Sequence, residues 1–400
     1  MKWLPARNEL GKEQNDFLDE VINTEQNESV AGFPGSGKTV VLLYAVVNLK
    51  KKNPKARILI VEFTHALIKM LQAALSEIAK EQEYQNLNIE DVEIRTYYDF
   101  VNRSHTQYDC IICDEVQDVP TIAIQNMKQR ANRVIVGGDA NQSIYQKDPR
   151  WQMPPCSLSE LDSILSPKKT NLTIIYRLTK KIISAINAFL PSMKILQGRS
   201  TMVKTNVQIR LWKSADKCQE ATHIMDEAIS RINNNDTVGI LVPTHNQVIA
   251  FANLALQIAN KPLWSEEQNA YGKTDFASLN NHLRANGIPM QYVANGYGNF
   301  TSENLITLTT YHSSKGLDFD AVMLPFCGVG DMPSMVTPTL FMVAMTRSRK
   351  DLFVSFSPNV PCSYVNSFSQ SCLYKDWTNN GVGNPGNGNS GKDEDEDFDF

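Results

Sequence analysis

The chain has 400 residues, a formal net charge of −4 and 42% hydrophobic side chains. This length and composition predict two or three globular domains with cores of ordinary size. No apolar run approaches the ~18 residues of a membrane span, and no apolar signal segment follows Met1, so we expect neither a membrane protein nor an exported one. The seven cysteines are odd in number and scattered, which favours a reducing cytoplasm.

The negative charge is concentrated in residues 393–400, which hold six carboxylates. Residues 1–378 hold 38 basic and 37 acidic side chains. A nearly neutral body neither requires nor excludes nucleic acid, because a local basic groove suffices for binding.

Gln14 lies near the start of the chain, beside a short amphipathic helix. Its amide can both donate to and accept from an adenine edge. We therefore expect it to contact a base if a nucleotide site follows, and otherwise to be a surface side chain.

A phosphate-binding loop follows at residues 32–39, which read Gly-Phe-Pro-Gly-Ser-Gly-Lys-Thr. Its pattern, G-x-x-x-x-G-K-[ST], lets successive backbone N–H groups turn toward phosphate oxygens. Lys38 is placed to reach the β- and γ-phosphates, and the hydroxyl of Thr39 to bind Mg²⁺. The apolar run of residues 40–47 predicts a helix whose positive dipole end lies beneath the anion. The remaining candidate nucleotide-binding residues of the loop are Gly32, Gly35, Ser36 and Gly37.

Two strand-like runs end in aromatic and hydroxyl side chains, where ligands bind in open α/β sheets. Such side chains suit stacked bases and phosphates along a single strand, although packing at the strand ends explains them equally well. They are Phe63, Thr64 and His65 after the first run, and Thr96 and Tyr97 after the second.

A third run, residues 108–113, ends in Asp114 and Glu115. Beside a phosphate loop, Asp114 can hold Mg²⁺ and Glu115 can polarise the attacking water. Cys110 and Cys113 form a C-x-x-C within this run, and we interpret them as buried strand residues rather than a metal or redox pair.

The next strand exit, residues 137–145, reads Gly-Gly-Asp-Ala-Asn-Gln-Ser-Ile-Tyr. The amide of Gln142 can sense a γ-phosphate or orient water. Together with the phosphate loop and Asp-Glu-x-Gln-Asp, this segment resembles the superfamily 1 helicases of the UvrD/Rep type. The resemblance makes Gln142 the residue that couples the γ-phosphate to DNA, and Tyr145 a DNA-side residue.

Further blocks resemble the same family in its order. In Asn171–Arg177 the resemblance implies that Tyr176 stacks on adenine and Arg177 reaches the γ-phosphate. The block around Thr310 and His312 implies DNA contacts. Its Lys-Gly-Leu-Asp implies nucleotide contacts for Gly316 and for Asp318, which stands where the family has glutamate. By the same match Arg347 is the arginine finger.

The chain also departs from the family. Only residues 99–107 are available for the first helical insertion and about sixty for the second. We therefore expect a compact form without the usual inserted subdomains, which puts strand separation in question. Trp151 either replaces the family's base-stacking tryptophan or caps a core, and we favour the core.

We expect an α/β fold of two tandem RecA-like P-loop domains with parallel sheets, in residues 1–167 and 168–378. Residues 379–392 read as a flexible Gly/Asn linker to a disordered acidic tip. The tip, with Phe398 and Phe400, suits docking on a partner protein, mimicry of DNA within the molecule, or plain solubility.

The sequence thus predicts an enzyme, an ATP hydrolase with ATP and Mg²⁺ as cofactors, that moves along single-stranded DNA. The resemblance implies 3′→5′ movement and disfavours RNA. The alternative is a nucleotide-switched ATPase subunit that binds DNA or a partner and unwinds little by itself.

Overall fold

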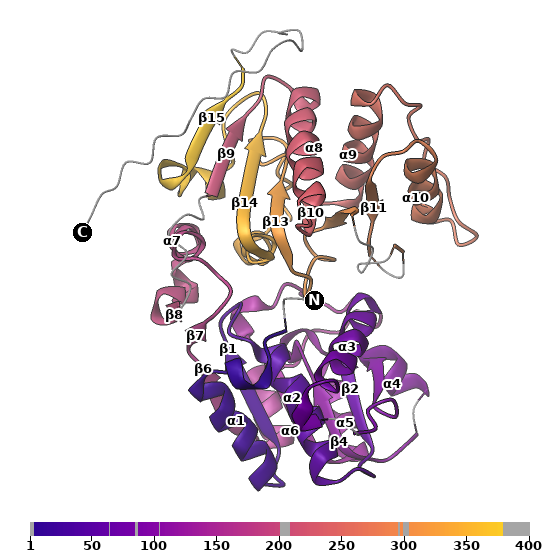
Figure 1. The fold of residues 1–400 in the computed structure, drawn as a ribbon, viewed down its shortest axis with the longest axis vertical. Coiled ribbons are helices and arrows are strands. Elements are labelled where there is room, and N and C mark those ends of the chain that lie inside the picture. The colour runs from indigo at the N-terminus through magenta and orange to yellow at the C-terminus, as the bar shows by residue number, and fades with distance from the viewer. Residues whose placement is uncertain are drawn as a thin grey trace.

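The computed structural model describes residues 4–63, 65–84, 87–103, 105–200, 209–294, 297–298 and 304–378. Most of the described strands form a six-stranded sheet and a seven-stranded sheet, and every pairing within each of these two sheets is parallel. Figure 1 shows the two sheets in separate lobes, one above the other. This arrangement confirms the expected α/β class with parallel sheets. The predicted linker and disordered tip, residues 379–400, lie outside the described residues.

The first sheet has the order β3-β2-β4-β5-β1-β6. Its central strands are apolar because parallel strands are covered by helices on both faces. The strands are β1 (Glu28–Gly32), β2 (Ile58–Glu62), β3 (Glu93–Thr96), β4 (Tyr108–Cys113), β5 (Ala131–Gly138) and β6 (Lys168–Leu172).

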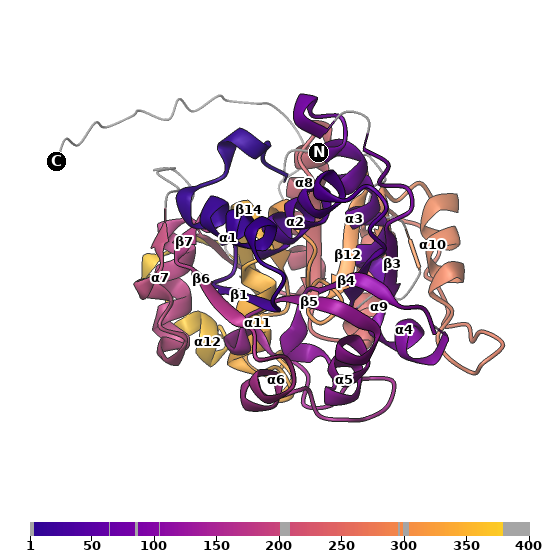
Figure 2. The same cartoon turned by 90° about the horizontal axis from the view of Figure 1, so that it is seen from below.

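Helices cover this sheet on both faces (Figure 2). Those on one face are α1 (Lys12–Asn23), α2 (Lys38–Lys52) and α3 (His65–Ile78). Those on the other are α4 (Tyr97–Arg103), α5 (Thr121–Arg130) and α6 (Leu158–Leu165). Each face has its own apolar cluster. Cys110 and Cys113 belong to opposite clusters, so they are buried strand residues that do not share one site, as expected.

The second sheet has the order β11-β12-β10-β13-β14-β9-β15. The strands are β9 (Ile209–Lys213), β10 (Val238–Val242), β11 (Met290–Tyr292), β12 (Ile306–Thr310), β13 (Phe319–Leu324), β14 (Ser348–Phe356) and β15 (Leu373–Asp376). Its helices are α8 (Lys217–Asn233), α9 (His245–Ile258), α10 (Phe276–Ala285), α11 (Pro338–Met345) and α12 (Ser363–Asn366).

A small unit lies between the two sheets in the chain and beside them in space (Figure 1). It pairs β7 (Ile174–Ile175) with β8 (Arg199–Ser200) and includes α7 (Lys180–Phe189). Apolar side chains of α7 belong to the same cluster as those of α1, α2 and α11, so one core runs from the first sheet to the second.

The predicted domain boundary at residue 167 falls just before β6. This strand pairs with β1 along its whole length, from Lys168 beside Glu28 to Leu172 beside Gly32. The first sheet therefore includes residues that the sequence assigned to the second domain. Periodicity alone gave no sign of this, because three of the five residues of β6 are exposed.

None of the helices in the described ranges is long and apolar enough to cross a lipid bilayer.

Candidate active site

The phosphate loop lies between the end of β1 and the start of α2, where the sequence places it. Gly35 and Gly37 have φ angles of +76° and +88°, in the left-handed region that favours glycine. A Cβ at Gly37 would lie 2.4 Å from Nε2 of Gln14, and one at Gly35 would lie 2.8 Å from Cβ of Arg177. The loop therefore depends on both glycines, and it is packed between a residue of α1 and one that follows β7.

Lys38 folds back over the loop. Its Nζ donates to the carbonyl oxygens of Gly32 at 2.7 Å and Phe33 at 3.4 Å. Burial lowers the pKa of the Lys38 ammonium, while the carboxylates of Asp139 and Glu115 oppose that shift. Ser36 is fully buried and its Oγ has no hydrogen-bond partner among the described residues. The ammonium of Lys38 and the hydroxyl of Ser36 are therefore available to bind an anion.

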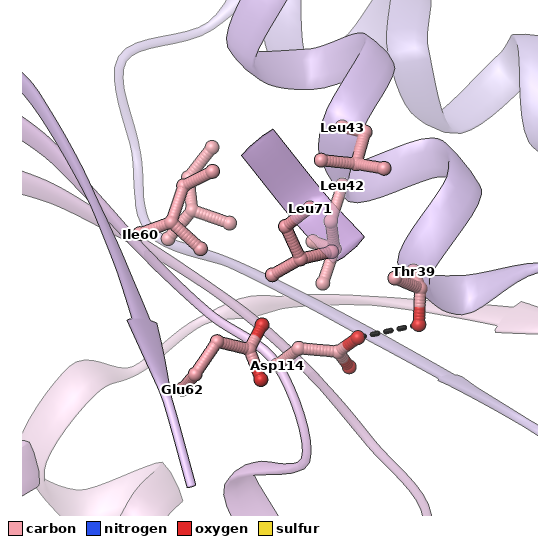
Figure 3. Close-up of a pocket in the computed structure, with 8 residues that line it drawn as sticks. Thr39, Leu42, Leu43, Ile60, Glu62, Leu71 and Asp114 are labelled. Carbon is pink, nitrogen blue, oxygen red and sulfur yellow. Dashed lines mark hydrogen bonds between the residues drawn. The ribbon is translucent and has the colours of Figure 1, made fainter. Parts of the chain in front are cut away.

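The strand β4 brings two carboxylates to the other side of the loop. Oγ1 of Thr39 donates to Oδ2 of Asp114 at 2.5 Å (Figure 3). Burial, with repulsion from Glu115, raises the pKa of Asp114. Glu115 has a φ of +50°, a strained conformation for a side-chain-bearing residue and one that recurs at functional sites. Thr39 and Asp114 are thus together at the predicted cation position.

Glu62, at the end of β2, is a third carboxyl group here and was not predicted. It lines a small pocket with Thr39 and Asp114 (Figure 3). Its Oε2 is buried without a hydrogen-bond partner in the described part of the chain. Burial and the nearby charges of Asp114 and Glu115 raise its pKa well above the usual value.

A ring of contacts surrounds Glu115 and begins on the first sheet. Nε2 of Gln117 donates to Glu115 at 2.5 Å, and Oε1 of Gln117 accepts from the backbone N–H of Asp139 at 3.0 Å. The carboxylate of Asp139 in turn accepts from Nε2 of Gln142 at 2.8 Å. The predicted base and the predicted γ-phosphate sensor therefore belong to one hydrogen-bonded network.

Lys315, in the turn that follows β12 of the second lobe, also contacts this network. Its Nζ donates to the backbone carbonyl of Gln142 at 3.0 Å, lies 3.5 Å from Oε2 of Glu115 and contacts the carboxylate of Asp118. Burial alone would raise the pKa of Glu115, but Lys315 and Lys38 lower it, so the carboxylate is held ionised. Sequence reasoning assigned no role to Lys315 or Asp118. Both stand inside the quoted blocks: Lys315 directly precedes Gly316, and Asp118 follows Glu115 by three residues.

Two arginines reach the site from beyond the first sheet. NH1 of Arg177 donates to Oδ1 of Asp318 at 2.5 Å, and its Nε is buried without a partner in the described ranges. Arg347 is 4% exposed and donates through Nε to the carbonyl of Val343 at 2.9 Å. Burial, with repulsion from Arg177, lowers the pKa of Arg347 to about 10. Repulsion between two neighbouring guanidiniums indicates a site built for more negative charge than the protein supplies.

The predicted adenine side is assembled from α1 and the segment after β7. Oε1 of Gln14 accepts from the backbone N–H of Gly11 at 2.9 Å, and its Nε2 donates to the carbonyl of Ser36 at 3.1 Å. The hydroxyl of Tyr176 lies against Gly11 and has no partner among the described residues. Gln14 and Tyr176 are therefore neighbours, and both flank the loop.

Residues 18–148 match the family described as "AAA domain", and residues 297–359 match the family described as "UvrD-like helicase C-terminal domain". The first match contains the phosphate loop and Asp114–Glu115, and the second contains Lys315, Asp318 and Arg347. The two matches together support the resemblance of this chain to the UvrD/Rep-type helicases of superfamily 1.

Among curated proteins, the RecBCD enzyme subunit RecB of Chlamydia trachomatis serovar D is 47% identical over 60 residues. That stretch is 14% of this chain and 6% of RecB, so the match spans only a small part of this curated relative. Among solved structures, an arterivirus nonstructural protein 10 (helicase) with DNA aligns at a TM-score of 0.45 and 14% identity, over 88% of this chain and 65% of that one. The C-terminal domain of a possible DNA helicase from Lactobacillus plantarum WCFS1 aligns at a TM-score of 0.33 and 13% identity, over 50% of this chain and 98% of that one. Both likenesses are too distant to bear on function.

The structure is compact at both points where the family that it resembles carries helical insertions. Only residues 104–107 separate α4 from β4. At the second point the described chain forms α9, α10 and β11, and β11 pairs with β12 in the sheet. The described segments at these two points therefore hold core elements and no separate helical subdomain.

Four of the predicted nucleic-acid residues lie in the first lobe, at the exits of its strands. Phe63 and Tyr97 are 7% and 1% exposed, and their rings stack at 5.2 Å. The ring of Tyr145 lies 4.7 Å from Phe63 and 5.6 Å from His312, so it joins the two lobes. Thr96 accepts from the N–H of Asp99 and so caps α4.

The remaining predicted residues lie in and beside the second lobe. Thr310 is 3% exposed and bonds to Ser313, next to His312. Gly316 has a φ of +82° in the turn after Lys315. Thr64 lies outside the described residues, and for His65 the structure gives only the backbone that begins α3.

Trp151 packs edge-on against Tyr97 at 5.3 Å, in keeping with the core interpretation. Beside it Tyr98 is 36% exposed, and the guanidinium of Arg150 lies 5.3 Å from the Tyr98 ring. Sequence reasoning passed over Tyr98 because it follows the expected Thr96–Tyr97 block directly. It is the exposed edge of this aromatic cluster.

Proposed function

We propose that this chain couples ATP hydrolysis to movement along single-stranded DNA, with 3′→5′ polarity as in its family. One observation carries the proposal. Arg177, from beyond the first sheet, packs against Gly35 of the phosphate loop, and Lys315 of the second lobe lies 3.5 Å from Glu115. Arg347 is close enough to Arg177 and Glu115 for their charges to act on its pKa. Hydrolysis that needs groups from both lobes depends on how the lobes close.

The residues of the site fit a nucleoside triphosphate with a divalent cation. Gly35 and Gly37 turn the backbone where a Cβ would not fit, and the buried hydroxyl of Ser36 lacks a partner in the described ranges. Gln14 and Tyr176 would hold the adenine. Thr39 and Asp114 would hold Mg²⁺, which supplies neutralisation of phosphate charge when bound.

In the proposed reaction, water attacks the γ-phosphorus, its proton passes to Glu115, and the bond to the β-phosphate oxygen breaks to leave ADP and phosphate. Lys315 supports this role because it keeps Glu115 ionised and able to accept the proton. Lys38, Arg177 and Arg347 would stabilise the charge on the transferring group. Asp318 would release Arg177 to the phosphate.

Single-stranded DNA is the proposed track. Gln142 links the two events, because its side chain reaches Asp139 of the nucleotide network and its carbonyl accepts from Lys315, three residues after His312. The Tyr145–His312 contact would change as the lobes open and close. Tyr98, which is 36% exposed, adds aromatic surface for bases.

The test is steady-state ATP turnover with and without single-stranded DNA at two salt concentrations. Stimulation that weakens with salt supports a strand-tracking motor, because phosphate contacts release counterions. Turnover that DNA leaves unchanged would overturn the motor.

A second function is favoured by the compact insertion points. The chain would then be a nucleotide-switched subunit that closes on DNA or on a partner protein, with hydrolysis only resetting it. Weak, DNA-insensitive turnover together with nucleotide-dependent complex formation would support this switch. Either function is proposed for the cytoplasm, where the seven free cysteines remain reduced.

A further inference from the structure

Basic residues are concentrated in one stretch that the nucleotide site does not explain. Residues 163–215 hold ten lysines and arginines and no aspartate or glutamate. The stretch includes the small unit of β7, α7 and β8, which Figure 1 shows at the side of the molecule between the two lobes.

Four cations of this unit are exposed and without a carboxylate partner in the described part of the chain: Lys180, Lys181, Lys194 and Arg199. Other lysines of the same stretch are paired. Lys168 lies 2.5 Å from Glu20, and Lys169 lies 2.5 Å from Asp162. Leu196, within the unit, is 60% exposed. The unit thus offers positive charge beside apolar surface.

The segment that precedes the last described strand lies against this unit. Phe189 of α7 packs on Tyr364 and Phe368, with ring centroids 5.9 Å and 6.1 Å apart. Burial raises the pKa of the Cys372 thiol to about 11, and the charge of Lys181 opposes that shift. Lys181 is therefore close to the residue that directly precedes β15, the last described strand.

We propose that residues 393–400 dock on the surface formed by α7 and β8 in the same molecule. Their sequence, Asp-Glu-Asp-Glu-Asp-Phe-Asp-Phe, brings six carboxylates and two aromatic rings to a surface with four unpaired cations and an exposed leucine. Residues 379–392 span up to about 48 Å when extended, which exceeds the ~13 Å length of the four-residue strand β15 that the chain must retrace. A tether of this kind gives an effective concentration near millimolar, so a weak contact is populated.

The contact does not rest on the proposed ATPase and is tested without nucleotide. A fluorescent peptide of residues 393–400 is titrated with full-length chains, and its anisotropy is measured. The acceptor carries a neutral tip of unchanged length, with the changes Asp393→Asn, Glu394→Gln, Asp395→Asn, Glu396→Gln, Asp397→Asn and Asp399→Asn. We expect this acceptor to bind the peptide at least ten-fold more tightly than the wild-type chain, whose own tip competes. Equal affinity for the two chains would overturn the proposal.

The surface is tested in the same neutral-tip background. Lys180→Glu/Lys181→Glu should weaken peptide binding at least five-fold, whereas the matched charge change Lys261→Glu/Lys273→Glu, near α10, should not. The milder Lys180→Gln/Lys181→Gln should weaken it by less, which separates charge from misfolding. A peptide with Phe398→Ser and Phe400→Ser should also bind more weakly. Binding that survives both α7 variants would show that the tip docks elsewhere.

Discussion

The ammonium of Lys315 and the carboxylate of Asp118 meet across the boundary between the two lobes, both almost completely buried. The same ammonium lies 3.5 Å from Glu115. An ion pair so placed joins the lobes and fixes the charge state of the residue proposed to accept the proton.

Lys315→Met should destabilise the fold by about 3–5 kcal/mol, because removal of one partner leaves a buried charge uncompensated. Urea unfolding measures this. Lys315→Met/Asp118→Asn should lose less than the sum of the two single variants, since the charge that one change strands is removed by the other. Strictly additive losses would show that the contact stabilises nothing.

Lys38→Ala should abolish ATP turnover, because no other ammonium in the described loop faces the phosphate position. Circular dichroism of the variant controls for folding. A variant that keeps half the wild-type rate would remove the loop lysine from the mechanism.

Glu115→Gln should bind ATP as the wild type does and hydrolyse it at least ~100-fold more slowly, the usual cost of losing a general base. Filter binding and single-turnover hydrolysis measure the two quantities separately. Loss of nucleotide binding would contradict the assignment of Glu115 as the base.

Much of this site follows from sequence because its residues are local to strand exits. The phosphate loop and Asp114–Glu115 come at the ends of apolar runs, so parallel pairing alone brings them together. The place of β6 in the first sheet could not be predicted from the sequence, because three of its five residues are exposed and its partner, β1, lies more than a hundred residues away. Lys315 was also missed, because a lysine between two assigned residues gives no sign of which carboxylate it will meet in space.

Phe63 and Tyr97 show that a sequence pattern does not tell which aromatic side chains will be buried. Aromatic residues at strand exits suit bases, yet here the two rings stack on one another and Tyr97 donates its hydroxyl to Asp148 at 2.8 Å. Which ring faces solvent is decided by the packing of α4 and Trp151, and this packing depends on contacts distant in sequence. Their role toward DNA stays a prediction.

Arg347→Lys should reduce kcat by about 10³-fold while nucleotide affinity changes little, as expected for a group that stabilises the transition state. Lysine keeps the charge but not the planar fork that reaches Val343, Leu317 and the phosphate position together. Steady-state kinetics measures kcat and KM, and equilibrium binding measures the nucleotide affinity separately. A rise in KM with unchanged kcat would instead make Arg347 a ground-state binding residue.

Glu62→Gln should stabilise the nucleotide-free fold, and more so at high pH. The raised pKa means that the folded state keeps a proton that the unfolded chain releases above about pH 4.5. Stability is therefore fully present below that pH and is lost as pH rises through the folded-state pKa, at about 1.4 kcal/mol per unit of difference between the two pKa values. Glutamine does not ionise, so its unfolding free energy lacks this loss. Urea unfolding at pH 5 and pH 8, without nucleotide or metal, should show the variant's advantage growing with pH. An advantage that is constant or shrinks would mean that Glu62 is ionised in the folded protein, held by a cation or a donor beside Asp114.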